Sequence, residues 1–281
     1  MSEWLLSQEL AVRLGFFFGV FILVALAEAA FPRRKRQYSR KLRWYANIGI
    51  VFLNSAIARL VLPILPMVLA ATAVERGWGL FNILSVPYWF ALIASVVLLD
   101  FFIYLQHVMV HAVPLLWRLH RMHHTDLDYD VTTGARFHPI EILLSLVIKL
   151  ALVLVLGPPV VAVLAFEVIL NAMAMFNHGN LKLPLGLDRW LRWVVITPDF
   201  HRVHHSTDPK ETNRNFGFNL SWWDRLLGTY KAQPALGHEG MEIGIDKFRE
   251  AKYLHLHQLL MQPFYPEGQF YAFNDLPQKD Q

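Results

Sequence analysis

Histidine side chains form the most unusual pattern in this chain of 281 residues. Ten of its thirteen histidines fall within residues 107–205, and eight of those follow His-x-x-x-His or His-x-x-His-His spacing. Side chains three or four residues apart lie on one face of a helix, one turn from each other. Because imidazole is the commonest metal ligand in proteins, the spacing predicts a metal site. The eight histidines are His107, His111, His120, His123, His124, His201, His204 and His205.

The number of histidines bears on how many ions such a site holds. Eight to ten imidazoles exceed the roughly four to six ligands of a single ion, so we expect two ions that share one site. No dense carboxylate cluster of the kind that binds magnesium or calcium is present. Imidazole ligands alone leave copper, zinc and iron open. His238, His255 and His257 stand apart from the motifs, and we interpret them as ordinary core or surface residues.

The composition points to a membrane protein. The chain is 55% hydrophobic and 17% charged, whereas an ordinary soluble domain is about 45–50% apolar and about 25% charged. The apolar residues are gathered into long runs, which excludes a disordered chain and argues against a soluble globule. The chain has no cysteine, so disulfides, thiolate metal sites and cysteine-held iron–sulfur clusters are excluded.

Four stretches are apolar enough to enter a bilayer, whose core takes about 20 residues of helix. The fourth has 35 residues, which is about 52 Å as one helix and too long for a single crossing. Gly157-Pro158-Pro159 interrupts it, so we expect a hairpin of two short helices. Pro63 and Pro66 likewise predict a kink or an early end in the second stretch. The stretches are 10–31, 48–73, 86–106 and 142–176.

The expected fold is an all-α integral membrane bundle of about four membrane-embedded helices, the last pair a hairpin, with a cytoplasmic helical cap that carries the histidine motifs. Residues 32–43 hold seven Lys and Arg and no acid. This places them in the cytoplasm, and the chain path then puts every histidine motif on that side. We interpret the basic run as an anchor to anionic headgroups. The expected parts are membrane helices in 1–95, a catalytic domain in 96–235 and an interfacial tail in 236–281.

Several motifs together resemble the fatty acid hydroxylase superfamily, also called the sterol desaturase family. Its members are integral membrane enzymes with histidine boxes and a diiron centre. The resemblance covers about residues 95–235, whereas the first ninety residues match only in being apolar. The motifs are Asp100-x-x-x-Tyr104-x-x-His107-x-x-x-His111, Trp117-Arg-Leu-His-Arg-Met-His-His124, Arg136-Phe-His-Pro-Ile-Glu141, Asn177-His-Gly-Asn180, Asp199-Phe-His-Arg-Val-His-His-Ser206 and Asn215-Phe-Gly-Phe-Asn-Leu-Ser-Trp-Trp-Asp-Arg-Leu-Leu-Gly-Thr-Tyr230.

The resemblance implies a ligand set and a group of outer partners. The eight spaced histidines would be metal ligands, and His138 and His178 would complete a set of ten. Polar side chains near them would fix the imidazole tautomers by accepting the other ring N–H. Helix capping or an ion pair is the alternative role for these outer residues. The candidates are Asp100, Glu141, Asn177, Asn180 and Asp199.

The resemblance also implies a reaction. The enzyme would hydroxylate, or desaturate, a C–H bond of a lipid or sterol-like substrate with O₂ and two iron ions, and zinc is a possible substitute in purified protein. No Gly-x-Gly-x-x-Gly fingerprint is present, so we expect a separate ferredoxin, cytochrome or reductase to supply electrons. Membrane lipids, not nucleic acid, are the other expected partners, in a bacterial inner membrane. Residues that could dock an acidic donor, or form a solvated or lipid-facing edge, are Arg118, Arg121, Arg202, Arg214 and Arg225.

Two other classes of protein remain open at this point. A histidine-rich metal transporter or metal-binding membrane protein would also gather imidazoles, although transport sites lie near the bilayer midplane with polar residues inside the spans. A zinc-dependent lipid hydrolase would use the same ligands. Oxygen consumption separates the hydrolase from an oxygenase, and stable metal retention without flux separates the transporter.

Overall fold

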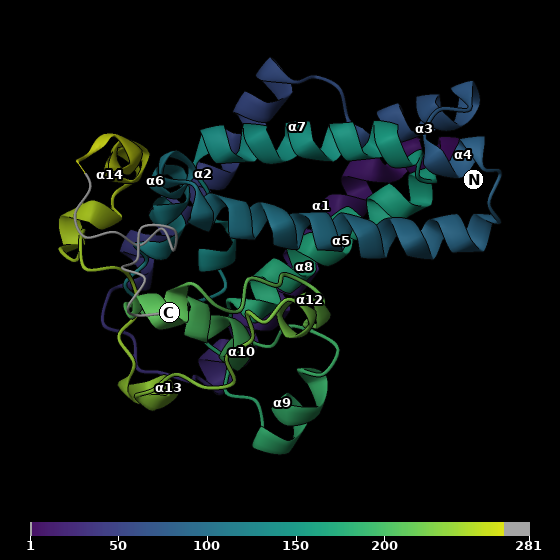
Figure 1. Cartoon of the computed structure of the whole chain (residues 1–281). Helices are drawn as coiled ribbons and strands as arrows, with labels where there is room; N and C mark the ends of the chain where they lie inside the picture. The colour runs from purple at the N-terminus through teal and green to yellow at the C-terminus, as the bar shows by residue number, and fades with distance from the viewer. Residues whose placement is uncertain (1, 267–281) are drawn as a thin grey trace.

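The computed structural model describes residues 2–266, where the regular structure is helical apart from three isolated β-bridges. The long helices pack side by side into a bundle, and the N-terminus lies at one end of it (Figure 1). Apolar runs explain these helices, because a helix pairs all of its backbone groups internally. The long helices are α1 (Ser2–Ala30), α2 (Arg40–Val61), α5 (Tyr88–Ala112), α7 (Pro139–Leu156) and α8 (Val160–Asn177).

Five segments of the described chain are long and apolar enough to span a membrane. This confirms the expected all-α membrane bundle. The sequence predicted about four embedded helices, and the structure has five candidates because each limb of the hairpin, α7 and α8, has 18 residues. At 1.5 Å per residue a limb measures about 27 Å, close to the ~30 Å of the hydrocarbon core. The candidate spans are Ser7–Ala30, Arg40–Ile83, Tyr88–Ala112, Pro139–Leu156 and Val160–Asn177.

Prolines end the second apolar stretch early, as the sequence predicted. The helix α2 stops at Val61, two residues before Pro63, and a new helix, α3 (Pro66–Arg76), starts at Pro66. Proline fits the first turn of a helix because the N–H that it lacks would have no partner there. A one-turn helix, α4 (Leu80–Ile83), then leads into α5.

The hairpin between α7 and α8 depends on one glycine. Gly157 ends α7 with φ +64°, the left-handed conformation that glycine adopts without steric cost. A Cβ atom at this position would overlap the carbonyl oxygen of Trp78, and the side-chain amide of Asn82 donates to the Gly157 carbonyl at 3.1 Å. The tip of the hairpin is therefore packed against the segment that leads into α5, which confirms the expected reversal of the chain.

Most of the remaining helices are short and form a cap around one end of the bundle. In Figure 1, α6 and α14 lie at that end, while α9, α10, α12 and α13 lie beside the bundle. The cap contains η1 (Thr133–Ala135), α6 (Pro114–His124), α9 (Leu185–Leu191), α10 (Pro198–Arg202), η2 (Val203–His205), α11 (Pro209–Thr212), α12 (Trp222–Leu226), α13 (Gly237–Gly240), η3 (Ala251–Leu254), α14 (Leu256–Met261) and η4 (Gln262–Phe264), where η denotes a 3₁₀ helix.

A buried ion network fixes the segment between α6 and α7. The fully buried guanidinium of Arg43 donates to both carboxylate oxygens of Asp126 at 2.7 and 2.8 Å and to Asp130 at 2.5 Å. Burial alone would raise the pKa of Asp126, but the guanidinium groups of Arg43 and Arg136 lower it to about 2. The ionised pair holds this segment, which directly follows the histidines of α6, against α2.

The basic run in 32–43 contacts the protein more than the sequence suggested. Arg33 forms an ion pair with Asp199 at 3.2 Å, and Arg34 donates to the Met241 carbonyl at 2.8 Å. The expectation of headgroup contacts is therefore wrong for Arg43 and does not describe these two arginines, which are partly buried in the cap. The contacts put this loop at the same end as the cap. Its exposed basic residues are Lys35, Arg36 and Lys41.

The described part of the C-terminal tail packs on the bundle. The described part of the tail that the sequence predicted to be interfacial contains three short helices, η3, α14 and η4, at its C-terminal side. Leu259 of α14 is fully buried in a cluster with Ile50 of α2 and Met122 of α6. The apolar side of this segment therefore faces protein. The predicted tail 236–281 extends beyond this, and its residues 267–281 lie outside the described residues.

Candidate metal centre

Nine of the ten histidines that the sequence singled out converge at the capped end of the bundle. The last turns of α5 supply two, α6 supplies three, the residue after α8 supplies one, and α10 with η2 supplies three. All nine are buried, with at most 3% of the residue exposed. They are His107, His111, His120, His123, His124, His178, His201, His204 and His205.

These histidines form two adjoining groups. Within each group, one ring nitrogen of every histidine lies within 4.8 Å of the others. Two nitrogens bound to one ion at about 2.1 Å can lie no more than about 4.2 Å apart, so small adjustments bring each group onto one ion. The first group is His107, His111, His120, His124 and His204, and the second is His123, His178, His201 and His205.

Each His-x-x-His-His motif divides between the two groups. His120 and His124 belong to the first group, whereas His123 belongs to the second. Positions i and i+4 of a helix differ by about 40° in direction and positions i+3 and i+4 by about 100°, which accounts for this split. The other motif divides in the same way with the groups exchanged, so His204 joins the first group. The two motifs thereby tie both groups into one site.

Oxygen atoms hold the outer nitrogen of five rings. When Nδ1 of a neutral imidazole donates its proton, Nε2 is left with a lone pair for a metal. Four of the five acceptors are backbone carbonyls or a carboxylate, which only accept. The Nδ1 contacts are His107 with the Phe216 carbonyl at 2.7 Å, His111 with Asn213 at 3.1 Å, His120 with Glu141 at 2.7 Å, His178 with the Ala174 carbonyl at 2.8 Å, and His204 with the Arg214 carbonyl at 2.8 Å.

His107 and His120 show why the first group needs a cation. Their Nδ1 protons are engaged by Phe216 and Glu141, so both Nε2 atoms present lone pairs. These two Nε2 atoms lie 3.2 Å apart. Two lone pairs at that distance repel, whereas a shared cation would turn the repulsion into coordination. The arrangement therefore favours a metal ion between the two rings.

His178 repeats this arrangement in the second group. Its Nε2 lies 3.1 Å from Nε2 of His123 and 3.2 Å from Nε2 of His205, while its Nδ1 donates to a carbonyl. Burial lowers the pKa of His178 to about 3 and holds the pKa values of His123 and His205 well below the usual range. These rings are therefore neutral near pH 7, which is the form that binds a metal.

The first group includes a buried nitrogen without a hydrogen bond. Among the described residues, Nε2 of His204 has no partner, although the residue is fully buried. An unpaired buried polar atom is costly, and a bound metal would remove the cost. The lone pairs, the burial and the neutral rings together fit a pair of metal ions, one in each group.

His138 is the one predicted ligand that the structure keeps apart. It caps the N-terminus of α7, where its Nδ1 accepts the backbone N–H of Ile140 at 3.2 Å, and its ring lies beside Phe264. It belongs to neither histidine group. The His-Pro-x-Glu motif thus starts a helix and, one turn later, places Glu141 against His120.

Of the five predicted outer partners, all of which are described residues, Glu141 is the one that forms a hydrogen bond with a grouped histidine. Its Oε1 accepts from His120 at 2.7 Å. The other four bind backbone groups, arginine side chains or, for Asp100, the indole N–H of Trp223, so they shape the loops around the site. Their partners are Leu220 and Trp223 for Asp100, Phe218 for Asn177, Arg34 for Asn180, and Arg33 and Arg202 for Asp199.

Sequence reasoning missed several groups that orient the rings. The side-chain oxygen of Asn213 accepts from Nδ1 of His111, and Asn213 lies two residues before the Asn215 motif that carries the resemblance. Its place beside this motif was the one sequence feature that could have pointed to Asn213 as a partner of a histidine. The carbonyls of Phe216, Arg214 and Ala174 left no signal, because every residue has a carbonyl.

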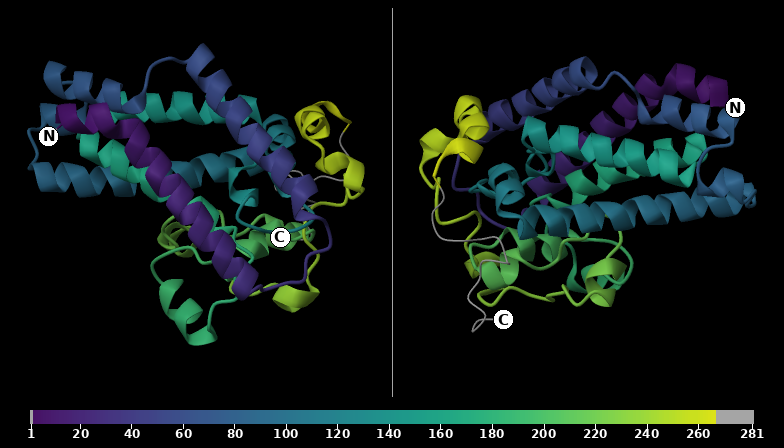
Figure 2. Two further views of the ribbon diagram at one scale, coloured as in Figure 1. Left: turned by 180° about the vertical axis from the view of Figure 1, so that it is seen from behind. Right: turned by 45° about the horizontal axis from the view of Figure 1, so that its top comes forward.

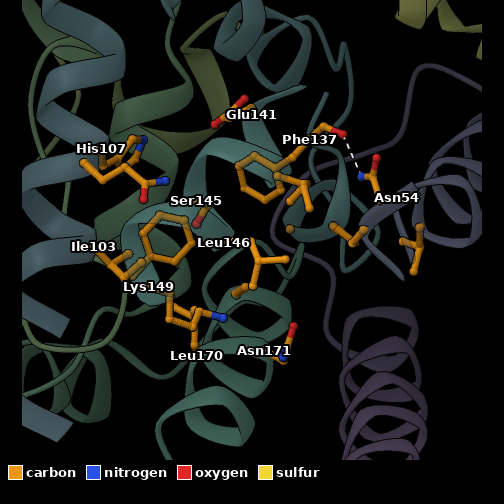
Figure 3. Close-up of a pocket in the computed structure, with 18 of the residues that line it drawn as sticks. Asn54, Ile103, His107, Phe137, Glu141, Ser145, Leu146, Lys149, Leu170 and Asn171 are labelled. Atoms are coloured by element: carbon orange, nitrogen blue, oxygen red, sulfur yellow. Dashed lines mark hydrogen bonds between the residues drawn. The ribbon is translucent and has the colours of Figure 1, made fainter. Parts of the chain in front are cut away.

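A cavity of about 400 Å³ opens from the metal centre into the bundle. His107 and Glu141 lie at one end of it, and Lys149 and Asn171 lie at the other (Figure 3). Its walls come from α1, α2, α5, α7 and α8, with apolar side chains such as Leu146 between the two ends. Most of the cavity wall therefore comes from the candidate spans.

The fold and the site define an integral membrane protein with histidine groups able to bind metal ions. Residues 92–229 match the family model described as fatty acid hydroxylase. This stretch includes all nine grouped histidines, and curated proteins similar to it include a lipid hydroxylase and a monooxygenase. The resemblance inferred from the motifs is confirmed.

Curated relatives include lipid-oxidising enzymes from bacteria, animals and plants. Ornithine lipid hydroxylase OlsE of Rhizobium tropici is 32% identical over 53% of this chain and 44% of its own length. Alkylglycerol monooxygenase of Homo sapiens is 27% identical over 62% and 39%. Methylsterol monooxygenase 2-2 of Arabidopsis thaliana is 25% identical over 61% and 65%. The chain thus spans less than two thirds of each relative. No solved structure matches it.

Proposed function

We propose that this protein is a membrane-bound oxygenase that hydroxylates, or desaturates, a C–H bond of a lipid with O₂ and two iron ions. One observation carries the proposal: a cavity among membrane-span helices ends at two of the grouped histidines, His107 and His120. A lipid chain in that cavity would lie directly against the metal centre.

The residues of the chain prepare the site for this reaction. When bound, two irons would supply the activation of O₂ that attack on an unactivated C–H bond requires. The grouped histidines would hold the ions as neutral ligands, and Glu141 orients His120 through a 2.7 Å hydrogen bond. Apolar walls, including Ile103, Phe137 and Leu170, exclude water around the substrate. Because imidazole also binds zinc, zinc can substitute for iron in purified protein.

The relatives support a lipid or sterol-like substrate. Their names specify an ornithine lipid, an alkylglycerol and a methylsterol. These molecules share a long or broad apolar part with a polar group attached. The cavity has the matching property, because apolar side chains separate its polar ends.

We place the metal centre on the cytoplasmic side of a bacterial inner membrane. The basic loop 32–43 lies at the same end as the histidines, as the Arg33–Asp199 ion pair shows. Lys35, Arg36 and Lys41 of this loop are exposed, and an excess of such residues favours the cytoplasmic face. Membrane lipids would therefore surround the spans, with the cap in the cytoplasm.

Electrons would come from a donor outside these 281 residues, such as a ferredoxin, a cytochrome or a reductase. Two of the five arginines considered for docking this donor are buried in the cap. Arg121 and Arg202 are buried and bond to carbonyls or to Asp199 inside the cap, so the expectation that they dock an acidic donor is wrong. Arg225 stacks between Trp193 and Tyr230.

The decisive experiment measures metal per chain and the iron spectrum. The protein is purified in detergent from iron-supplemented cells, and Mössbauer spectroscopy follows elemental analysis. About two irons per chain with a coupled diiron signal is the result that the two histidine groups lead us to expect. A screen of membrane lipids for products that incorporate label from ¹⁸O₂ would then identify the substrate.

Other outcomes would separate the remaining classes. Zinc that iron reconstitution cannot replace, together with no oxygen consumption, would favour a zinc-dependent lipid hydrolase. Metal that is bound but crosses the membrane in vesicles would favour a transporter. No tightly bound metal would overturn the proposal, because the two histidine groups would then have another purpose.

A further inference from the structure

Four charged side chains meet inside the candidate spans, away from the metal centre. Glu9 and Arg13 lie on α1, Lys149 on α7 and Glu167 on α8. Arg13 pairs with Glu9 at 2.7 Å and also with Glu167, and Lys149 pairs with Glu167 at 2.6 Å. We call these four residues the ion cluster. Charges inside a membrane segment are costly and are usually retained for function.

The ion cluster lies at the far end of the cavity from the histidines. Arg13 and Lys149 both line the cavity. Arg13 also lines a second hollow of about 500 Å³, which Glu167 and aromatic side chains of α1 border. The helices α1 and α2, which form the rim of this second hollow, run across the same face of the bundle (Figure 2). The cluster therefore stands where a lipid-facing groove adjoins the inner cavity.

Contacts between helices account for only part of the cluster. The ion pairs join α1, α7 and α8, which is what a helix clamp would do. However, both cations border the cavity, and Nε of Arg13 is buried without a hydrogen-bond partner among the described residues. An unpaired donor in a buried site calls for an acceptor. The cluster has two cations and two carboxylates, so it needs no further charge.

We propose that the ion cluster binds the polar group of the lipid substrate. The unpaired donor and the balanced charge select an uncharged oxygen acceptor: a hydroxyl, an ester or an amide. This inference rests on the proposed function and adds a specificity site to it. Arg13 and Lys149 contact the polar group, and Glu167 holds both cations in place.

The spacing along α7 sets how far this group lies from the reacting carbon. Glu141 borders the metal end of the cavity, and Lys149 borders the other end, eight residues later. Eight residues of helix measure about 12 Å. A substrate anchored at the cluster would therefore present a carbon about 12 Å from its oxygen to the metal centre.

A binding experiment with sixteen-carbon probes tests the proposal without enzyme activity. Zinc-loaded protein in phosphatidylcholine nanodiscs would be incubated with tritiated 1-hexadecanol, in competition with unlabelled 1-hexadecanol, methyl palmitate, hexadecane or palmitate. We expect 1-hexadecanol and methyl palmitate to compete at least about tenfold better than hexadecane, since a hydrogen bond from a charged donor is strong. Palmitate should compete less well than the ester.

Variants distinguish binding from a purely structural role. Lys149→Met and Arg13→Met each leave Glu167 with one cation, and each should reduce the preference for the oxygenated probes by about tenfold. Lys149→Arg should restore it. Arg59→Met is the matched control, because Arg59 is an arginine of the candidate-span helix α2 that borders neither hollow, and it should keep the preference.

The outcomes decide between the roles. A preference that survives both methionine variants would overturn the proposal and leave the cluster as a helix clamp. So would variants that melt earlier yet keep the preference when assayed below their melting temperature. A lost preference with unchanged zinc content supports the binding site. Because the assay uses zinc, failure to find a diiron centre would refute the proposed oxygenase while the binding result still stood.

Discussion

Glu141 and Asp100 offer a sharp test of how the metal centre is organised. Both are buried carboxylates that the sequence marked as outer partners. Glu141 accepts from His120, whereas Asp100 accepts from the backbone of Leu220 and the indole of Trp223. The variant Glu141→Gln keeps the size of the side chain and removes its charge. Asp100→Asn makes the same chemical change at a carboxylate that binds Leu220 and Trp223 and not a grouped histidine.

The expected magnitude follows from the hydrogen bond that changes. A hydrogen bond to a charged group contributes about 1.5–3 kcal/mol, and a neutral one contributes about 0.5–1.5 kcal/mol. The difference of about 1–1.5 kcal/mol corresponds to roughly tenfold in metal affinity. Loss of an outer partner of a ligating histidine typically costs about 10–100-fold, which agrees. Only the ion held by the first histidine group should be affected, because His120 belongs to that group.

Metal titration against a competing chelator measures this effect. In Glu141→Gln, one of the two ions should dissociate at roughly tenfold lower chelator concentration, while the other is retained. Asp100→Asn should bind both ions as the unmodified protein does. Equal weakening of both ions in Glu141→Gln, or the same loss in Asp100→Asn, would refute the assignment of Glu141 to one ring of one group.

Three further changes probe other parts of the structure. Gly134→Ala would drive a Cβ into the backbone of α8 beside His178, so metal analysis should show loss from the second group alone. Arg43→Met removes the buried cation that pairs with the carboxylates of Asp126 and Asp130. It should lower the free energy of unfolding by about 3–5 kcal/mol in denaturant titrations. The pKa of Asp126 is lowered to about 2 from 3.8, so the stability from this pair is present above pH 3.8 and is lost as the pH falls toward 2. His138→Ala should keep both metals by elemental analysis, and a missing metal would make it a ligand.

Local sequence patterns were sufficient to predict most of the helices and the main turn of the fold. Proline and glycine act on their own backbone, so Pro66 and the Gly157 turn could be placed without knowledge of the tertiary structure. Apolar runs of sufficient length predicted the candidate spans for a similar reason, because whether a helix can span a bilayer depends on the length and composition of that segment alone. The membrane bundle followed from these local rules.

The histidine motifs show what local spacing rules cannot predict about the site. Helical spacing predicted that eight rings gather, and all eight do so, together with His178, which the family resemblance added. It could not assign them to two groups, because that depends on how α5, α6, α8 and η2 approach each other. His138 has the same residue type and a motif of its own, yet its position at the start of α7 turns it to a capping role.

The sequence by itself determined a membrane helical bundle, a gathering of histidines able to bind metal ions, and a match of residues 92–229 to the fatty acid hydroxylase family model. These properties follow from segment length, composition and short-range spacing. Only the tertiary structure decided which contacts form between distant residues. Glu141 is the one of the five predicted outer partners that bonds to a grouped histidine, Arg43 is buried with Asp126, and Arg13 pairs with Glu167. Each of these contacts joins residues far apart in the chain, so it depends on helix packing that no local pattern encodes.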